Sequence, residues 1–277
     1  MRTDTSQPLF VGIVWGALLA IATFGAGGCI SMGSLTPGQM DWVQPRSEAP
    51  RAGTVYLLRG WVGVFSGGID VLSEKIQRDG LTARVFQHDQ CQELARTMAE
   101  RYRAAKDPEP ICLIGHSFGA DDALVIAREL DKVGVPVDMV VTLDTVDQRQ
   151  VPKNVKACYN YYQPGIFGGS NFLRGIPLTP EPGSTGQLFN VNLLEEGKAL
   201  RAWDTTHVNI DEAPKVHQAI IEHLLAICPE RAAWVAAHSG QRDPKFASTP
   251  VLEGARTAAG RIAPARDQAS RDGASAR

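Results

Sequence analysis

A serine between two glycines is the residue of this sequence best suited to nucleophilic chemistry. The stretch Gly115-His-Ser-Phe-Gly119 follows the apolar run Ile111–Ile114 and opens a segment with helical character. A Gly-x-Ser-x-Gly pattern lets the chain turn sharply from strand to helix, with the serine in a strained conformation at the tip and the glycines leaving room for close packing. The amino end of such a helix favours developing negative charge. Ser117 is therefore predicted to be a nucleophile of acyl transfer rather than an ordinary loop serine.

The elements that must position this serine follow from an alternation of apolar runs and helical patterns. Parallel strands are buried on both faces and read as continuous apolar runs, and strands that alternate with helices predict a mostly parallel sheet with helices on both faces, an α/β fold. Functional groups of such sheets gather just beyond the carboxyl ends of the strands. The expected strands are 54–58, 82–86, 111–115, 137–143, 155–162 and 187–193, and the expected helices are 69–78, 91–105, 120–133 and 214–228.

From Thr54 to about Cys228 the chain resembles the α/β-hydrolase superfamily, and in layout it is similar to lipases, esterases and thioesterase domains. The resemblance implies a catalytic triad in the chain order serine, acid, histidine. Among the six histidines, His88 and His116 precede the serine, and His116 is expected to line the site. His217 and His223 fall within the closing helix, for which Asp211 is a plausible cap, and His238 borders the tail. His207 lies in the loop before that helix, where the superfamily places its base, and is predicted to be that base.

The resemblance leaves two candidates for the acid. Many members carry it after the strand that corresponds to 155–162, but here Gln163-Pro-Gly follows and no carboxylate occurs until Glu181. The preceding strand ends in Leu143-Asp-Thr-Val-Asp, a position that some lipases and thioesterase domains use. Asp144 is the favoured acid, with Asp147 as the alternative; a turn or cap is the other interpretation of Asp144.

The oxyanion hole requires two main-chain N–H groups. The resemblance assigns one to Phe118, directly after the nucleophile, and the other to the loop after the first strand, where relatives often have His-Gly and this chain has Arg59-Gly60. Trp61 is then the donor by position. A tight turn is an equally good explanation of Gly60.

These residues predict hydrolysis of a carboxylic ester, from a lipid or a small molecule, through an acyl-enzyme. No metal or organic cofactor is expected. The long segment 164–186 has the composition of a lid or substrate-binding loop, although its apolar residues could equally anchor it to the core. A thioesterase or amidase with the same triad and a non-catalytic envelope lipoprotein that keeps the fold are the alternatives.

The amino-terminal segment has the layout of a secretory signal. Leu9 to Ile30 contains no charged residue, Arg2 precedes it, and Ala26-Gly27-Gly28 stands directly before Cys29. The segment resembles a bacterial lipoprotein signal, whose cleavage leaves a lipid on the cysteine. An uncleaved anchor and a buried core helix are the alternatives. We expect an exported protein of the cell envelope, held at the membrane through this end and facing the periplasm or the exterior.

Length and composition set the remaining expectations. With 277 residues and a net charge of −2, one large domain is expected, and the lack of a basic run argues against a nucleic-acid partner. The expected organisation is a signal or anchor at 1–30, a linker at 31–52, the hydrolase-like domain at 53–238 and a disordered tail at 239–277. The cysteines other than Cys29, namely Cys91, Cys112, Cys158 and Cys228, permit two disulfides. For Cys112 and Cys158, which lie in expected strands, burial as small apolar residues is the alternative.

Overall fold

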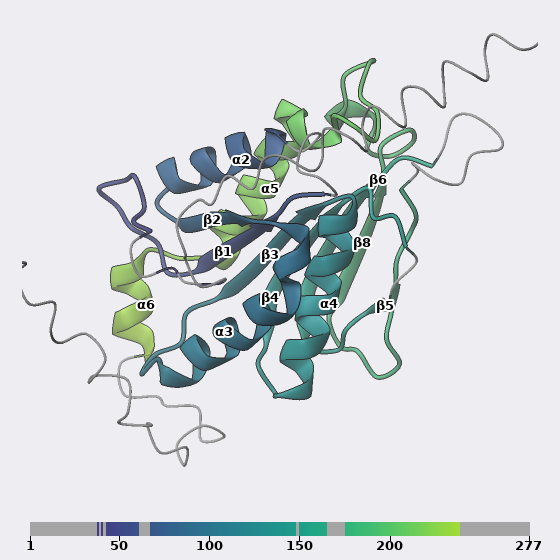
Figure 1. Cartoon of the computed structure of the whole chain (residues 1–277). Helices are drawn as coiled ribbons and strands as arrows, with labels where there is room; N and C mark the ends of the chain where they lie inside the picture. Colours follow the sequence, from purple (N-terminus) through teal and green to yellow (C-terminus); the bar gives the residue numbers. More distant parts are fainter. Residues whose placement is uncertain are drawn as a thin grey trace, which may run out of the picture.

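The computed structural model describes residues 38, 40, 43–60, 67–147, 150–164 and 175–238. Its centre is a six-stranded sheet in the order β2-β1-β3-β4-β6-β8, in which every neighbouring pair is parallel. The predicted fold class, a mostly parallel sheet with helices on both faces, is confirmed (Figure 1). The strands are β1 (Thr54–Leu58), β2 (Thr82–Phe86), β3 (Ile111–His116), β4 (Val137–Leu143), β6 (Val155–Tyr162) and β8 (Gln187–Asn192).

Two helices cover each face of this sheet. The core on one face packs the sheet against α3 (Cys91–Ala104) and α4 (Phe118–Lys132). The core on the other face packs it against α2 (Gly67–Arg78) and α5 (Pro214–Ile227). Both cores are built mainly from buried aliphatic side chains, and each fully buried Val, Leu or Ile contributes roughly 1.5–3 kcal/mol by leaving water. The central strands are buried on both sides, which explains why β3 and β4 read as continuous apolar runs.

Shorter elements complete the described chain. A two-stranded parallel sheet joins β5 (Gln150–Val151) to β7 (Thr179–Pro180). The remaining helix is α6 (Arg231–His238), and the single 3-10 turns are η1 (His88–Gln90), η2 (Lys198–Leu200) and η3 (Ile210–Glu212). Within the described ranges, no helix has both the length and the apolar character needed to cross a membrane. The predicted signal or anchor at 1–30, with Cys29, and the predicted tail at 239–277 lie outside these ranges.

The four cysteines of the domain are free thiols, so neither of the two permitted disulfides is present. Cys112, Cys158 and Cys228 are buried, as expected of small apolar residues, and burial raises the pKa of Cys158 to about 12. The Sγ atoms of Cys112 and Cys228 lie 3.9 Å apart.

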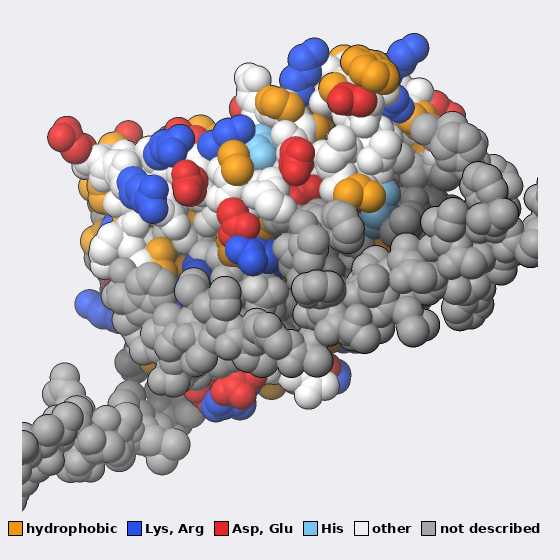
Figure 2. Space-filling model, turned by 45° about the horizontal axis from the view of Figure 1, so that its top comes forward, with side chains coloured by type: hydrophobic (Ala, Val, Ile, Leu, Met, Phe, Trp, Pro, Cys, Tyr) orange, Lys and Arg blue, Asp and Glu red, His pale blue; other side chains and the backbone are white. Residues whose placement is uncertain are grey.

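The surface shown in Figure 2 carries acidic and basic side chains that are interspersed. Scattered hydrophobic side chains stand between them on the same face. Among the described residues of this face no large area of a single sign is visible, in keeping with the net charge of −2.

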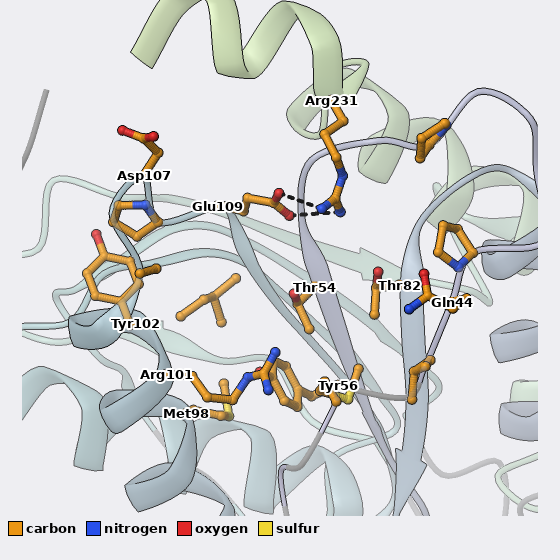
Figure 3. Close-up of a pocket in the computed structure, with 17 residues that line it drawn as sticks. Gln44, Thr54, Tyr56, Thr82, Met98, Arg101, Tyr102, Asp107, Glu109 and Arg231 are labelled. Atoms are coloured by element: carbon orange, nitrogen blue, oxygen red, sulfur yellow. Dashed lines mark hydrogen bonds and ion pairs between the residues drawn. The ribbon is translucent and has the colours of Figure 1, made fainter. Parts of the chain in front are cut away.

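A cavity of about 470 Å³ lies at the edge of the sheet where the strands begin (Figure 3). Thr54, Thr82 and Ile111, the first residues of β1, β2 and β3, line it together with side chains of α3 and the Glu109–Arg231 ion pair. In a parallel sheet this edge is opposite the carboxyl ends of the strands. Neither Ser117, Asp144 nor His207 lines this cavity, so it is separate from the candidate active site.

Candidate active site

The nucleophile and the acid predicted from the sequence stand at the same edge of the sheet. Ser117 follows β3 and Asp144 follows β4, and the two strands are adjacent, with His116 paired to Leu143 at their ends. The Ser117 N–H donates to the carbonyl of Leu143 over 2.9 Å, and the Asp144 N–H donates to that of Tyr161 over 2.9 Å. The parallel register therefore brings both residues to one level beyond the carboxyl ends of the strands.

The turn at Ser117 is as sharp as the sequence motif requires. Ser117 has φ 56° and ψ −124° and is the N-cap of α4. A Cβ on Gly115 would lie 2.1 Å from the Gly119 carbonyl oxygen, and one on Gly119 would lie 2.4 Å from the Leu58 carbonyl oxygen. Both positions therefore exclude any side chain, and the positive φ of a non-glycine residue stores strain of order 1–3 kcal/mol at the serine.

His207 reaches this serine from the loop that connects η2 to η3. Its Nε2 lies 3.0 Å from Ser117 Oγ, which is the distance of a hydrogen bond in which the hydroxyl donates to the ring nitrogen. Both side chains are nearly buried, with 9% and 8% of the residue exposed. This contact joins residues that are 90 positions apart in the chain, and it is the geometry in which a base removes a hydroxyl proton.

Asp144 faces the other nitrogen of the same ring. Its Oδ2 lies 3.5 Å from His207 Nδ1, which is longer than a hydrogen bond but close enough for a direct electrostatic contact. Its Oδ1 accepts the Gln163 N–H over 2.6 Å. Burial raises the pKa of the Asp144 carboxyl above its ordinary value, and the attraction of His207 and the Gln163 amide act in the opposite direction.

The alternative acid, Asp147, lies elsewhere. It is exposed, and its N–H donates to the carboxylate of Asp121 over 3.2 Å. The structure thus places Asp144, not Asp147, beside His207. A close approach of the chain at Gly175 covers Asp144, because a Cβ there would lie 2.0 Å from Oδ1.

The predicted oxyanion donors are only partly within the described residues. Phe118 is the first residue of α4, where main-chain N–H groups have no partner inside the helix. Trp61 lies outside the described ranges. Arg59, just after β1, pairs with Asp70 of α2 over 2.5 Å, so this cation is anchored to the following helix.

Two predicted roles differ in the structure. His116 does not line an open site: it is 1% exposed, and its Nε2–H donates to the His207 carbonyl over 2.8 Å. Asp211 does not cap the closing helix, whose N-cap is Ala213; it is fully buried, and its carboxylate accepts the Ile69 N–H at the start of α2. Sequence periodicity could not reveal either contact, because each joins residues that are far apart in the chain.

One further group stands beside the nucleophile turn. His88 donates from Nδ1 to Asp122 over 2.9 Å, and its ring centroid is 6.0 Å from that of Phe118. Across the described ranges no three or more His, Cys, Asp or Glu residues are grouped so as to hold a metal ion. The described groups that can do chemistry are therefore the Ser117 hydroxyl, the His207 imidazole beside it and the Asp144 carboxylate on the other side of that imidazole.

No protein-family model and no curated protein matches this chain. Similar solved structures include an α/β serine hydrolase without a lid from Xanthomonas campestris, with 14% identity, 67% of this chain and 87% of that chain covered, and a TM-score of 0.41. Est1E from Butyrivibrio proteoclasticus has 11% identity, with 66% and 91% covered and a TM-score of 0.39. SrfTE, the thioesterase domain that cyclises the lipopeptide antibiotic surfactin, has 12% identity, with 62% and 91% covered and a TM-score of 0.39.

Proposed function

We propose that this protein is a serine hydrolase that cleaves a carboxylic ester through an acyl-enzyme. The observation that carries the proposal is the 3.0 Å contact between Ser117 Oγ and His207 Nε2, with Asp144 on the opposite side of the imidazole. A serine hydroxyl is a weak nucleophile until a base removes its proton, and this arrangement supplies that base.

The proposed reaction runs in two halves. His207 takes the Ser117 proton as Oγ attacks the ester carbonyl, and the main-chain N–H groups of Phe118 and Trp61 stabilise the oxyanion. His207 then gives the proton to the departing alcohol. Water attacks the acyl-enzyme by the same steps in reverse and releases the acid.

Asp144 stabilises the imidazolium that forms in each half-reaction. Its Oδ1 already accepts a hydrogen bond from the main-chain N–H of Gln163, and its Oδ2 faces the ring. Because both groups are buried, their interaction is screened little by water and is stronger than it would be at the surface. The carboxylate also favours the tautomer with the proton on Nδ1, which leaves Nε2 ready to accept the serine proton.

The proposed substrate class is a carboxylic ester of a lipid or a small molecule. Its support is the sequence of the amino-terminal segment, since export would separate the enzyme from cytosolic thioesters of coenzyme A and acyl carrier proteins. On the basis of the same segment, we propose that the protein is located in the cell envelope and is anchored there through a lipid on Cys29. Mass spectrometry of the mature amino terminus tests this point, and an intact Met1 or an unmodified Cys29 would count against it.

The enzymatic proposal is tested by a serine-directed fluorophosphonate applied to the full-length protein, followed by mapping of the modified residue. We expect labelling at Ser117 and hydrolysis of short p-nitrophenyl esters, with both lost in Ser117→Ala. His223→Phe is the control, because the contacts of His223 are with Tyr159 and the Tyr161 hydroxyl rather than with Ser117, Asp144 or His207, and a phenyl ring keeps the stacking on Tyr159.

Three outcomes separate the alternatives. Full ester hydrolysis in Ser117→Ala would remove this serine from the mechanism. No labelling and no hydrolysis over many acyl lengths would favour a non-catalytic envelope protein with this fold. Labelling at Ser117 with turnover only of thioesters or only of amides, in a matched panel of substrates, would keep the mechanism and reassign the substrate.

A further inference from the structure

A second histidine lies directly behind the proposed base. His116 precedes the nucleophile in the chain, and its Nε2–H donates to the main-chain carbonyl of His207 over 2.8 Å. The centroids of the two rings are 5.5 Å apart. Because His116 is 1% exposed, this hydrogen bond is shielded from water, and its loss would leave a buried carbonyl without its donor.

Asp211 completes this arrangement on the far side of His116. Its Oδ1 faces His116 Nδ1 at 3.7 Å and has no hydrogen-bond partner among the described residues. Its Oδ2 accepts the N–H of Ile69 over 3.3 Å at the beginning of α2. The Asp211 carbonyl accepts a hydrogen bond from the Nε2–H of His217, whose Nδ1 in turn faces Lys75 at 3.1 Å.

The packing leaves little freedom in this region. A Cβ on Gly68 would lie 2.0 Å from the Asp211 carbonyl oxygen, so the start of α2 rests directly against the η3 turn. His116 and Asp211 therefore tie together three segments that follow different parts of the sheet: the nucleophile turn, the His207 loop and the start of α2.

The charge states of these groups agree with the direction of the hydrogen bonds. Burial lowers the pKa of His116 to about 4, so its ring is neutral near pH 7 and carries its proton on Nε2. Burial likewise raises the pKa of Asp211 to about 7. A neutral imidazole with Nε2–H is the form that donates to the His207 carbonyl.

We propose that His116 is a positioning residue, which holds the main chain of His207 so that Nε2 stays within hydrogen-bond distance of Ser117 Oγ, and that Asp211 supports it from behind. This inference rests on the proposed function, because it assigns the contact a role in activating Ser117. A displacement of about 1 Å in a catalytic group costs roughly 100-fold in rate, so the loss of this buried donor has a measurable effect on the chemical step.

The test compares two variants of similar size. His116→Gln carries an amide nitrogen at about the position of Nε2 and keeps the donor, whereas His116→Leu fills the space and removes it. We expect His116→Leu to lower the rate of fluorophosphonate labelling and the kcat for ester hydrolysis by about 10- to 100-fold with KM within about 2-fold, and His116→Gln to recover most of both. Thermal unfolding of each variant, with His223→Phe as control, accounts for any loss of folded protein.

A double-mutant cycle addresses Asp211. If both residues act on the His207 loop, the loss of labelling rate in His116→Leu/Asp211→Ala will be smaller than the product of the two single losses. Independent, multiplicative losses would overturn the support that we assign to Asp211.

The remaining outcomes bear on His116 alone. Labelling of His116→Leu at the parent rate would overturn the proposal. Equal losses in His116→Leu and His116→Gln would also overturn it, because a merely structural role does not distinguish a donor from a methyl group. Failure of the parent protein to be labelled at all would instead contradict the proposed function, so the two failures are distinguishable.

Discussion

The carboxylate of Asp144 approaches Nδ1 of His207 to 3.5 Å from the end of β4, the strand next to the one that carries Ser117. The strand beyond it, β6, ends at Tyr162 and contributes the Gln163 amide that holds the same carboxylate. The end of β6 thus supplies a hydrogen-bond donor to an acid that follows the neighbouring strand β4.

Replacing the acid by its amide tests this geometry. Asp144→Asn keeps the shape but removes the charge that stabilises the imidazolium, and we expect kcat to fall by about 100- to 10,000-fold. The measurement is the rate of ester hydrolysis, supported by the fluorophosphonate labelling rate. Asp147→Asn is the control, since the Asp147 residue is exposed. A comparable loss of kcat in Asp147→Asn would contradict the assignment of Asp144 as the acid.

The strained turn predicts a trade between stability and activity. Ser117 has φ 56°, a conformation that glycine adopts without strain and alanine does not. We therefore expect Ser117→Gly to unfold at a higher urea concentration than Ser117→Ala, by about 1 kcal/mol in free energy of unfolding, with both variants inactive. Equal stability of the two variants would show that the turn stores no strain.

Two glycines in the first turns of different helices are expected to respond oppositely to substitution by alanine, as measured by the free energy of unfolding. A Cβ on Gly119 would lie 2.4 Å from the Leu58 carbonyl oxygen, whereas one on Gly67 meets nothing within 4 Å. We expect Gly119→Ala to lower the free energy of unfolding by several kcal/mol, because main-chain atoms must move. Gly67→Ala, at the first position of α2, is expected to be neutral or to stabilise by about 0.5 kcal/mol. Urea unfolding of both variants provides the measurement.

The buried carboxylate of Asp211 predicts a pH dependence of stability. Its pKa is raised to about 7 in the folded protein, against about 3.9 in the unfolded chain. The folded state then binds more protons between these values, so this group lowers stability as the pH rises from about 4 to about 7. Asp211→Asn removes that contribution, and its stability relative to the parent should increase over this interval.

This comparison is made by urea unfolding of parent and variant at pH 5 and pH 8. The lowered pKa of His116 and of His217, each about 4, acts in the opposite direction and raises stability with pH. Both histidines are present in parent and variant, so the difference between the two proteins isolates Asp211. A difference that does not grow between pH 5 and pH 8 would contradict the raised pKa.

Much of the fold follows from local patterns in the sequence. Continuous apolar runs mark β3 and β4 because parallel strands are buried on both faces, and the glycines beside Ser117 mark a turn that only glycine-flanked residues can form. These signals act over a few neighbouring residues, so the order of strands and helices and the place of the nucleophile could be predicted. The predicted helix starts at Cys91 and Pro214 agree with the structure, whereas α4 and α2 begin two residues earlier than predicted, at Phe118 and Gly67, since capping depends on packing.

The choice between Asp144 and Asp147, and the roles of His116 and Asp211, depended on the tertiary structure. Only two residues separate the two aspartates in the chain, and only the packing of Gln163 and His207 around one of them decides which is buried beside the imidazole. His116 and Asp211 meet because loops after different strands converge at one edge of the sheet. Residue type and spacing determined which groups could do chemistry; contact between distant loops, which no local pattern encodes, decided which groups touch.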